Sequence, residues 1–263
     1  MTLQCAQQLH SHMQLDRSQN VLEIAAGAGL GSLDIVQYLV DGHSKLPRET
    51  KRTFTITDLS PVMVTMAEEN FTDVNWGGVG IKFTEANGQD LAAVATGSMD
   101  RYIASLCLQL TPDPDAMLRE ANRVLTPDGI AGFTIWGTPD RSGTFEINAA
   151  ANEELGLENT AEHSNFVMGR DLPALRERFT KAGFKQVQIW PFQCVVELWS
   201  GEDFAKLHHE MFPLERGQEL LKTQRFEIVQ RKADEWLTRG TPIGLETYII
   251  VARASLDSIK AML

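Results

Sequence analysis

A glycine-rich segment near the start of the chain has the residue types that receive a nucleotide-like cofactor. Gly27, Gly29 and Gly31 directly follow an apolar stretch. Because glycine has no side chain, a ligand can approach its backbone closely, and the free N–H groups at the start of a helix attract polar ligand groups. A dinucleotide-binding pattern, G-x-G-x-x-G, starting at Gly27 would need glycine at position 32, which is Ser32. The segment therefore predicts a cofactor site, but it is compatible with several nucleotide cofactors.

Two carboxylates accompany this segment. Glu23 lies within the apolar stretch, four residues before Gly27, and a carboxylate in such surroundings must be paired or must serve a ligand. Asp58 ends a second apolar stretch, where nucleotide-binding α/β folds place an acidic residue that accepts hydrogen bonds from ribose hydroxyls. The alternative interpretations are that Glu23 bonds only to nearby backbone and that Asp58 only caps the helix that follows.

A polar loop after a third apolar stretch completes the set. It contains Asn87, Gly88 and Gln89, and a polar side chain beside backbone N–H groups suits the hydrogen-bonding edge of adenine. Taken alone, this is an ordinary polar loop. Its position gives it weight, because ligands of open α/β sheets bind at the edge formed by the carboxyl ends of the strands.

The elements that must position these residues alternate along the first half of the chain. Apolar stretches predict seven strands, at residues 20–25, 53–57, 79–84, 101–107, 129–136, 186–198 and 245–252. Amphipathic stretches predict helices at residues 30–40, 60–70, 114–125 and 171–182, with two helical segments within 202–237. Alternation of strands and helices predicts a parallel sheet with right-handed crossovers.

We therefore expect one α/β domain over residues 1–263. Its doubly wound, mostly parallel seven-stranded sheet carries helices on both faces, and a helical cover is inserted in the C-terminal half. The expected core comprises residues 18–137, 171–200 and 244–263, and the expected cover or substrate elements are residues 138–170 and 201–243.

The composition favours a globular protein that acts on small molecules. The 263 residues are 43% hydrophobic and 22% charged, and the net charge is −11. A nucleic-acid partner would favour a basic surface, and no run of Lys and Arg is longer than Lys51-Arg52, so we expect no such partner. No apolar run approaches the roughly 20 residues that a membrane span needs.

The cysteines and the first residues favour a cytoplasmic protein. Cys5, Cys107 and Cys194 are odd in number and lack metal-ligand spacing, so we expect reduced, buried thiols and no metal site. Residues 1–20 carry polar side chains throughout and do not read as a signal peptide. We expect a cytosolic protein or the processed form of an organellar one.

Four segments together resemble the class I, Rossmann-like methyltransferases that use S-adenosylmethionine. They are VLEIAAGAG at residues 21–29, ITDLSPVMV at 56–64, FTEANGQDL at 83–91 and LREANRVLTPDGIAGFTIWG at 118–137. The most specific part is RVLTPDG at residues 123–129, which is similar to the family's RVLKPGG turn before strand five. The similarity is greatest to the small-molecule branch that includes ubiquinone- and menaquinone-pathway methyltransferases.

The resemblance implies roles for individual residues. Glu23 would orient the amino group of the methionine portion, and Asp58 would hold the ribose hydroxyls. The other implied cofactor-binding residues are Ala25, Gly27 and Gly29 at the amino-acid end and ribose, Leu59 and Met63 against the adenine, Asn87, Gly88 and Gln89 at the adenine edge, and Ser105 and Leu106 at the methionine portion and the transferred methyl.

The chain departs from the family pattern at three positions. Ala25 replaces the first glycine, so we expect the turn to accommodate its methyl group without a positive φ. Asn87 replaces the common aspartate, so its hydrogen bond to adenine would lose its charge. Asp128 replaces a glycine of the turn before strand five.

The implied reaction is an in-line displacement at an activated sulfonium, which needs alignment and exclusion of water more than a general base. After the predicted fourth strand the chain lacks the motifs of amino-methylating nucleic-acid enzymes and metal-dependent catechol enzymes, and Cys107 is expected to be a packed thiol. His163 is the candidate base or orienting group. The other candidate substrate-binding residues are Trp136, Asn165, Phe166, His208 and His209.

Two other functions remain open at this point. The first is an NAD(P)-dependent oxidoreductase, which Ser32 disfavours. The second is an S-adenosylmethionine-binding partner protein without transferase activity. The leading interpretation is transfer of a methyl group from S-adenosylmethionine to a small-molecule acceptor.

Overall fold

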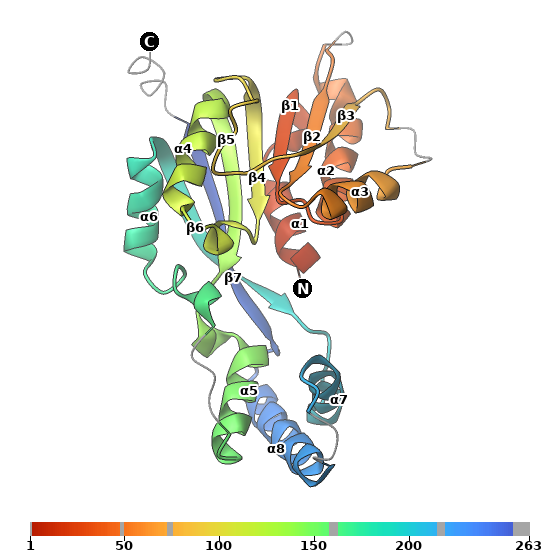
Figure 1. Ribbon diagram of the computed structural model, residues 1–263, viewed down its shortest axis with the longest axis vertical. Coiled ribbons are helices and arrows are strands. Elements are labelled where there is room, and N and C mark those ends of the chain that lie inside the picture. The colour runs from red at the N-terminus through yellow and green to blue at the C-terminus, as the bar shows by residue number, and fades with distance from the viewer. Residues whose placement is uncertain (1, 48–49, 73–75, 158–162, 215–218, 255–263) are drawn as a thin grey trace. The chain divides into compact units, whose positions relative to one another are not determined.

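Strands and helices alternate through the first half of the computed structural model, which describes residues 2–47, 50–72, 76–157, 163–214 and 219–254 (Figure 1). The strands are β1 (Asn20–Ile24), β2 (Thr53–Asp58), β3 (Gly80–Glu85), β4 (Met99–Ser105), β5 (Leu125–Trp136), β6 (Phe184–Val195) and β7 (Gly244–Ala254). The helices are α1 (Thr2–His12), α2 (Leu30–Asp41), α3 (Pro61–Asn70), α4 (Pro114–Val124), α5 (Gly143–Glu154), α6 (Leu172–Lys181), α7 (Gly201–Met211) and α8 (Glu219–Thr238).

The seven strands form one sheet in the order β3-β2-β1-β4-β5-β7-β6. The pairs β1–β2, β1–β4, β2–β3 and β4–β5 are parallel. The strand order reverses at β1. Strands β2 and β3 extend the sheet on one side of β1, and β4 and β5 extend it on the other. In open α/β sheets a ligand crevice forms outside the carboxyl ends of the strands at such a switch point. The expected fold class is confirmed.

Helices cover both faces of the sheet, as two adjacent residues of β5 show. A Cβ at Gly132 would lie 2.5 Å from Met13 Sδ and 2.9 Å from Leu9 Cδ1, so the segment around α1 lies against this face. The ring of Phe133 lies 5.2 Å from that of Phe179 in α6. Because successive side chains of a strand point to opposite faces, α1 and α6 lie on opposite sides of the sheet.

The chain divides into two compact units. The sheet unit comprises Thr2–Ile135, Asp171–Trp190 and the chain from Tyr248 onward, and the helical unit comprises Trp136–Arg170 and Pro191–Thr247. The unit boundaries fall within β5, β6 and β7. The expected cover elements, residues 138–170 and 201–243, fall within the helical unit, and their role as a cover stays a prediction.

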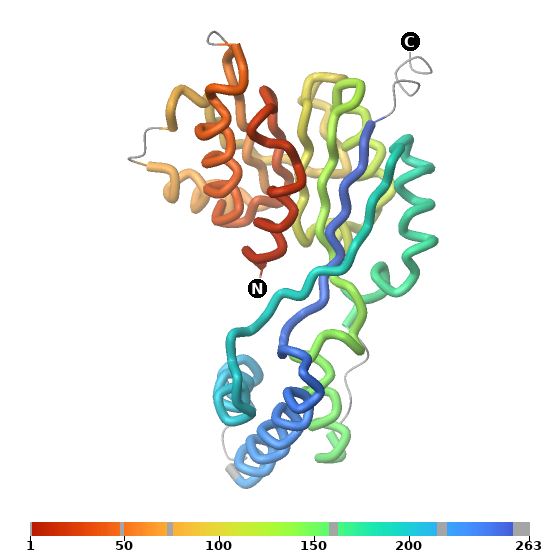
Figure 2. The backbone as a smooth tube through the Cα atoms, turned by 180° about the vertical axis from the view of Figure 1, so that it is seen from behind, coloured from red at the N-terminus to blue at the C-terminus, as the bar shows by residue number. Residues whose placement is uncertain are grey.

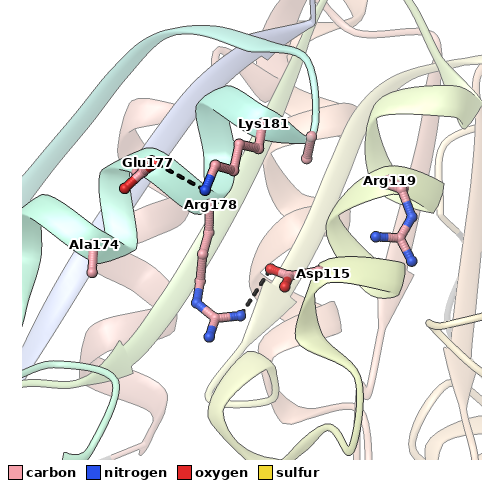
Figure 3. Close-up of a pocket in the computed structure, with 7 residues that line it drawn as sticks. Asp115, Arg119, Ala174, Glu177, Arg178 and Lys181 are labelled. Carbon is pink, nitrogen blue, oxygen red and sulfur yellow. Dashed lines mark hydrogen bonds and ion pairs between the residues drawn. The ribbon is translucent and has the colours of Figure 1, made fainter.

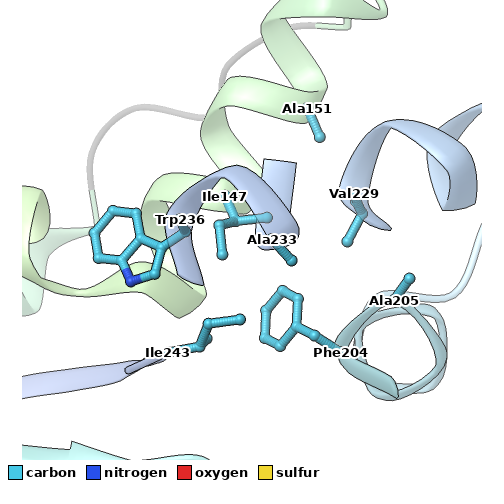
Figure 4. Close-up of a cluster of buried hydrophobic side chains, with 8 residues drawn as sticks. All are labelled: Ile147, Ala151, Phe204, Ala205, Val229, Ala233, Trp236 and Ile243. Carbon is cyan, nitrogen blue, oxygen red and sulfur yellow. The ribbon is translucent and has the colours of Figure 1, made fainter. Parts of the chain in front are cut away.

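The helical unit has a hydrophobic core of its own, drawn in Figure 4. Three helices supply most of it: α5, α7 and α8. Its buried members are Ile147, Ala151, Phe204, Ala205, Val229, Ala233, Trp236 and Ile243. No helix in the described ranges is long and apolar enough to cross a membrane.

Two helices were not expected from the sequence. Helix α1 has buried side chains at Cys5 and Leu9, continued at Met13, so the four-residue spacing was present but lay among polar residues. Helix α5 buries Ile147 and Ala151 in the core of the helical unit, although its apolar pattern is weak. Tertiary packing, more than the local sequence pattern, therefore determines that these two segments are helical.

The turn before β5 also differs from expectation. Helix α4 ends at Val124 and β5 begins at once, so the expected strand start at residue 129 was wrong. Met99 of β4 pairs with Leu125, but Arg101 pairs with Ile130, so β5 carries a bulge between these pairs. Asp128 lies in this bulge with φ +64°, a conformation that Asp adopts more readily than most residues. Asp128 therefore takes a left-handed conformation of the kind that glycine favours.

Candidate cofactor site

The turn between β1 and α2 has a left-handed backbone at three positions. The φ angles are +55° at Ala25, +57° at Gly27 and +80° at Gly29. The expectation that Ala25 avoids a positive φ was therefore wrong, and its methyl group is accepted at a cost of roughly 1 kcal/mol. A Cβ at Gly27 would meet no atom within 4 Å, whereas one at Gly29 would lie 3.0 Å from Ala67 Cβ in α3. The backbone at Gly27 thus faces open space.

Glu23 is buried beneath this turn. Its side chain is in β1, the residue is 4% exposed, and Oε2 accepts a 2.5 Å hydrogen bond from the Ser32 hydroxyl. The alternative interpretation was that Glu23 bonds only to nearby backbone, but its carboxylate accepts from the side chain of Ser32. The pKa of Glu23 is raised to about 7: burial raises it most, the Ser32 hydrogen bond partly offsets this, and the nearby Asp58 charge adds a smaller increase.

Asp58 joins the turn to the start of α3. Its Oδ2 accepts the Gly27 N–H at 2.9 Å, and its Oδ1 accepts the Ser60 N–H at 2.9 Å. Ser60 is the N-cap residue with Pro61 after it, but its own hydroxyl makes no capping bond. Each carboxylate oxygen can accept a second hydrogen bond. The bonds to the Gly27 and Ser60 N–H groups therefore leave acceptor capacity for the two hydroxyls of a vicinal diol.

The loop after β3 is held by its own side chains. Asn87 Oδ1 accepts the Gln89 N–H at 3.0 Å, and Gln89 Oε1 accepts the Asp113 N–H at 2.8 Å. Gly88 is buried, and a Cβ there would lie 2.9 Å from Ile24 Cγ2 and 3.3 Å from Met117 Cε. Packing therefore requires glycine at this position and brings the loop close to the end of β1.

Near the start of α3, two apolar side chains occupy the positions expected to contact adenine. Leu59 is 69% exposed and Met63 is half-buried. The site thus offers an apolar surface next to the carboxylate of Asp58.

The end of β4 is tied to β5. The Leu106 N–H donates to both the carbonyl oxygen and Oγ1 of Thr134 at 2.9 Å, and Leu106 has φ +52°. Ser105 Oγ lies 2.8 Å from Thr134 Oγ1. Burial raises the pKa of Cys107 to about 11, with a smaller contribution from Asp58, so the thiol stays protonated at neutral pH. This agrees with a packed thiol, as does the burial of Cys5 and Cys194.

Sequence reasoning missed His10 at this site. It is 1% exposed in α1, and its Nδ1 lies 2.6 Å from Asp34 Oδ2 in α2. A Cβ at Gly31 would lie 3.8 Å from His10 Cε1 and 3.6 Å from Glu23 Oε1, so His10 and Glu23 border the same point. The sequence carried no signal for this contact, because α1 was not expected.

The helical unit brings together most of the expected substrate-binding residues. The ring of Trp136 lies 4.8 Å from that of His163 and 4.9 Å from that of Phe166. Phe145, which sequence reasoning missed, joins them at 4.8 Å from Trp136. The backbone N–H of Asn165 donates to His163 Nδ1 at 3.3 Å. We call Trp136, Phe145, His163 and Phe166 the aromatic cluster.

His208 and His209 have other surroundings. His208 is 2% exposed in α7, its Nε2 lies 2.8 Å from Asn148 Oδ1, and its ring lies 4.9 Å from that of Phe212. Burial lowers the pKa of His208 to about 4, with help from the Arg225 charge. His209 is half-buried and lines a surface groove together with Phe226.

A charged groove between α4 and α6 of the sheet unit is drawn in Figure 3. Arg178 pairs with Asp115 at 2.8 Å, and Lys181 pairs with Glu177 at 2.8 Å. These exposed charges neutralise one another, and such pairs contribute little to stability. We therefore assign no ligand to this groove.

Comparison with known proteins agrees with the arrangement of the sheet unit. The family model described as "Methyltransferase domain" matches residues 22–133. A ubiquinone/menaquinone biosynthesis C-methyltransferase of Rickettsia bellii is 29% identical over 112 residues, which are 43% of this chain and 42% of that protein. A ubiquinone biosynthesis O-methyltransferase of Xanthomonas oryzae is 26% identical over 155 residues, 59% of each chain. The chain thus matches about half the length of these relatives.

Solved structures share the fold at low identity. The YcgJ protein of Bacillus subtilis matches with a TM-score of 0.55 and 17% identity, covering 96% of this chain and 98% of that one. The cyclase SpnF matches with a TM-score of 0.54 and 16% identity, covering 96% and 81%. Because a cyclase matches as well as methyltransferases do, these likenesses establish the fold alone. Residues 22–133 thus match the methyltransferase domain model, and the order of the sheet agrees with the class I, Rossmann-like fold of such domains.

Proposed function

We propose that this protein transfers a methyl group from S-adenosylmethionine to a small-molecule acceptor. The observation that carries the proposal is the pair of carboxylates at the switch point of the sheet. Buried Glu23 and the Asp58 carboxylate flank a turn whose Gly27 backbone faces open space. Acceptors at both places suit a ligand with a cationic amino-acid end and a ribose diol.

The chain's residues fit this cofactor on physical grounds. The charge of Glu23 is costly in its buried place, as its raised pKa of about 7 reflects, and a cationic group would offset that cost. Asp58 is already aligned by the Gly27 and Ser60 N–H groups, so its remaining acceptor capacity is pre-oriented for ribose hydroxyls. Exposed Leu59 offers an apolar surface for the adenine.

The sulfonium of the cofactor supplies an activated methyl group when it is bound, so the protein's contribution is binding, orientation and exclusion of water. Glu23 and Asp58 hold the two ends of the cofactor. The paired ends of β4 and β5, through Leu106 and Thr134, fix the backbone expected to face the methionine portion. Ala25, Gly29, Met63, Asn87, Gly88, Gln89 and Ser105 complete the proposed cofactor-binding set.

We propose that the aromatic cluster contacts the acceptor. The rings of Trp136, Phe145 and Phe166 are apolar surfaces that suit a flat or apolar molecule. Because His163 Nδ1 accepts the Asn165 N–H, the neutral ring carries its hydrogen on Nε2. In this tautomer the Nε2–H group is available to donate to an acceptor molecule, which favours an orienting role for His163 over that of a base.

A small molecule is a better acceptor for this chain than a nucleic acid. The net charge of −11 opposes a polyanion. Arg52, of the basic pair Lys51-Arg52, is buried and donates to the carbonyls of Leu39 and Gly42. The names of the two curated relatives make small intermediates of ubiquinone biosynthesis the first acceptors to screen, for both carbon and oxygen methylation.

The test is a transfer assay with S-adenosylmethionine labelled in its methyl group. We expect label to move to at least one small acceptor in that screen and not to duplex DNA or RNA. Calorimetric titration with S-adenosylmethionine and with NAD accompanies the assay. Binding of NAD alone would contradict the proposal, and binding of S-adenosylmethionine without transfer to any acceptor would favour a partner protein without transferase activity.

A further inference from the structure

A second pocket, with a volume of about 440 Å³, lies within the helical unit. Its lining residues come from the turn after β5, from β6, from the end of α8 and from β7. A volume of this size is in the range of small-molecule sites. The lining residues that decide what it can bind are Asp140, Arg141, Phe192, Trp236, Arg239 and Glu246.

One charged residue of this pocket, Glu246 in β7, is only 4% exposed. Its Oε2 accepts the N–H of Thr138 at 2.9 Å and the Thr138 hydroxyl at 2.8 Å, which fixes the orientation of the carboxylate. Its Oε1 lies 3.8 Å from Arg141 Nε, which is beyond hydrogen-bond distance. This second oxygen therefore retains capacity for a donor group of a ligand.

Hydrogen bonds hold the wall of the pocket that carries Arg141. Gln193 Nε2 in β6 donates to the Arg141 carbonyl at 3.3 Å. The Ser142 hydroxyl donates to the Thr138 carbonyl at 2.8 Å and accepts the Glu246 N–H at 3.1 Å. The turn is thus tied to β6 and β7 before any ligand binds, which lowers the entropic cost of binding.

The other positive charge of the pocket is placed by an aromatic ring. Arg239 follows the end of α8, and its guanidinium carbon lies 5.4 Å from the centroid of the Trp236 ring. Trp236 is 7% exposed, and its Nε1 donates to the Pro242 carbonyl at 3.2 Å, so the ring is itself fixed. No carboxylate pairs with Arg239 in the part of the chain that the structure describes. Its N–H groups can therefore bind an anionic group of a ligand.

Charges of both signs line this pocket. Asp140 and Glu246 are negative, and Arg141 and Arg239 are positive. A ligand with a single charge would meet two groups of its own sign, whereas a zwitterion can pair each of its ends with the opposite charge. Half-buried Phe192 adds an apolar ring to the lining. The pocket is thus complementary to a molecule with two opposite charges and an apolar body.

We propose that this pocket binds a small apolar amino acid, with its carboxylate at Arg239 and Arg141 and its ammonium group at Glu246 Oε1. Arginine presents paired N–H donors to a carboxylate, and an ammonium group brings donors without acceptors to Oε1. The site goes beyond the proposed function, because its described lining residues include neither the cofactor turn nor the aromatic cluster.

Calorimetric titration of the full chain with three matched compounds tests this site. L-phenylalanine has both charged ends, 3-phenylpropionate lacks the ammonium group, and phenethylamine lacks the carboxylate. We expect wild-type protein to bind L-phenylalanine, and L-leucine as a second apolar amino acid. Each singly charged compound should bind roughly 10- to 100-fold more weakly than L-phenylalanine, the effect of losing one charged contact.

Arg239→Gln removes one positive charge at an exposed position, so the fold should persist. It should weaken L-phenylalanine roughly 10- to 100-fold and leave phenethylamine unchanged, and Arg239→Lys should restore part of the lost affinity. Arg231→Gln in α8 is the matched control, because Arg231 is exposed and pairs with Glu154 and Glu235 instead of lining the pocket. It should leave the affinities for all these compounds unchanged.

Three results would each overturn the proposal. The first is that neither L-phenylalanine nor L-leucine binds to folded wild-type protein. The second is equal affinity of wild-type protein for L-phenylalanine and the two singly charged compounds. The third is equal affinity of Arg239→Gln and Arg231→Gln for L-phenylalanine. Binding of S-adenosylmethionine is measured separately, so failure of this site and failure of the proposed function can be told apart.

Discussion

Glu23→Gln should make the protein more stable at neutral and alkaline pH while weakening its cofactor site. The folded protein holds Glu23 with a pKa of about 7 against 4.5 for the unperturbed group, mainly because of burial. Between these two values the folded state retains a proton that the unfolded state has lost. The contribution of Glu23 to the free energy of unfolding therefore falls as pH rises from about 4.5 to 7 and is constant above that range.

The size of this effect follows from the two pKa values. A difference of 7 − 4.5 = 2.5 units corresponds to about 3 kcal/mol, since one unit is about 1.4 kcal/mol. Glutamine has nearly the same shape, its amide oxygen can accept the Ser32 hydroxyl, and it does not ionise. Glu23→Gln should therefore be more stable than wild type by up to about 3 kcal/mol at pH 8, with little difference at pH 4.5.

Urea unfolding at a series of pH values, in the absence of ligand, measures this directly. A matched control is Glu85→Gln at the end of β3, where the carboxylate is exposed, and this variant should follow the wild-type pH dependence. The reasoning is refuted if Glu23→Gln is less stable than wild type at pH 8, or if the difference between the two does not change with pH. Calorimetry should also show that Glu23→Gln binds S-adenosylmethionine at least tenfold more weakly, because a charged acceptor is lost.

Three further predictions concern separate parts of the chain. Gly88→Ala should destabilise the protein by about 1–3 kcal/mol in urea unfolding, since its methyl group would lie 2.9 Å from Ile24 Cγ2, and an unchanged midpoint would contradict this packing. Acid should destabilise the protein through His208, whose pKa of about 4 in the fold lies below the ordinary 6.5, so that stability is lost as pH falls from 6.5 towards 4. His208→Gln should remove that part of the pH dependence, and a slope equal to that of wild type would count against it. His163→Ala should slow turnover with little change in the affinity for S-adenosylmethionine, and an unchanged rate with the true acceptor would exclude the orienting role.

The sequence predicted β1, β2 and β4 well because these strands are short and bury apolar side chains. The stretches that became β1, β2 and β4 are apolar, so their burial follows from local composition. The glycines after β1 and the carboxylate of Asp58 lie at strand ends, and the rule for open α/β sheets places strand ends together. The positions of the expected cofactor residues could therefore be predicted without knowledge of side-chain contacts.

Contacts between distant segments could not be predicted in the same way. Asp34 lies 24 residues from His10, and only the packing of α1 on α2 brings the two side chains together. The positive φ of Ala25 is likewise set by the surrounding turn, against the preference of alanine itself. In the helical unit, the burial of His208 depends on where α7 packs, which the sequence did not indicate.

The central claim is that the turn after β1 binds S-adenosylmethionine, and titration calorimetry on wild-type protein and Asp58→Ala tests it most directly. We expect one S-adenosylmethionine site per chain in the wild-type protein. We expect at least tenfold weaker binding by Asp58→Ala, which loses the acceptors for the ribose diol and for the Gly27 and Ser60 N–H groups. Equal affinity of a folded Asp58→Ala, or binding of NAD and not of S-adenosylmethionine by wild type, would contradict this assignment of the turn.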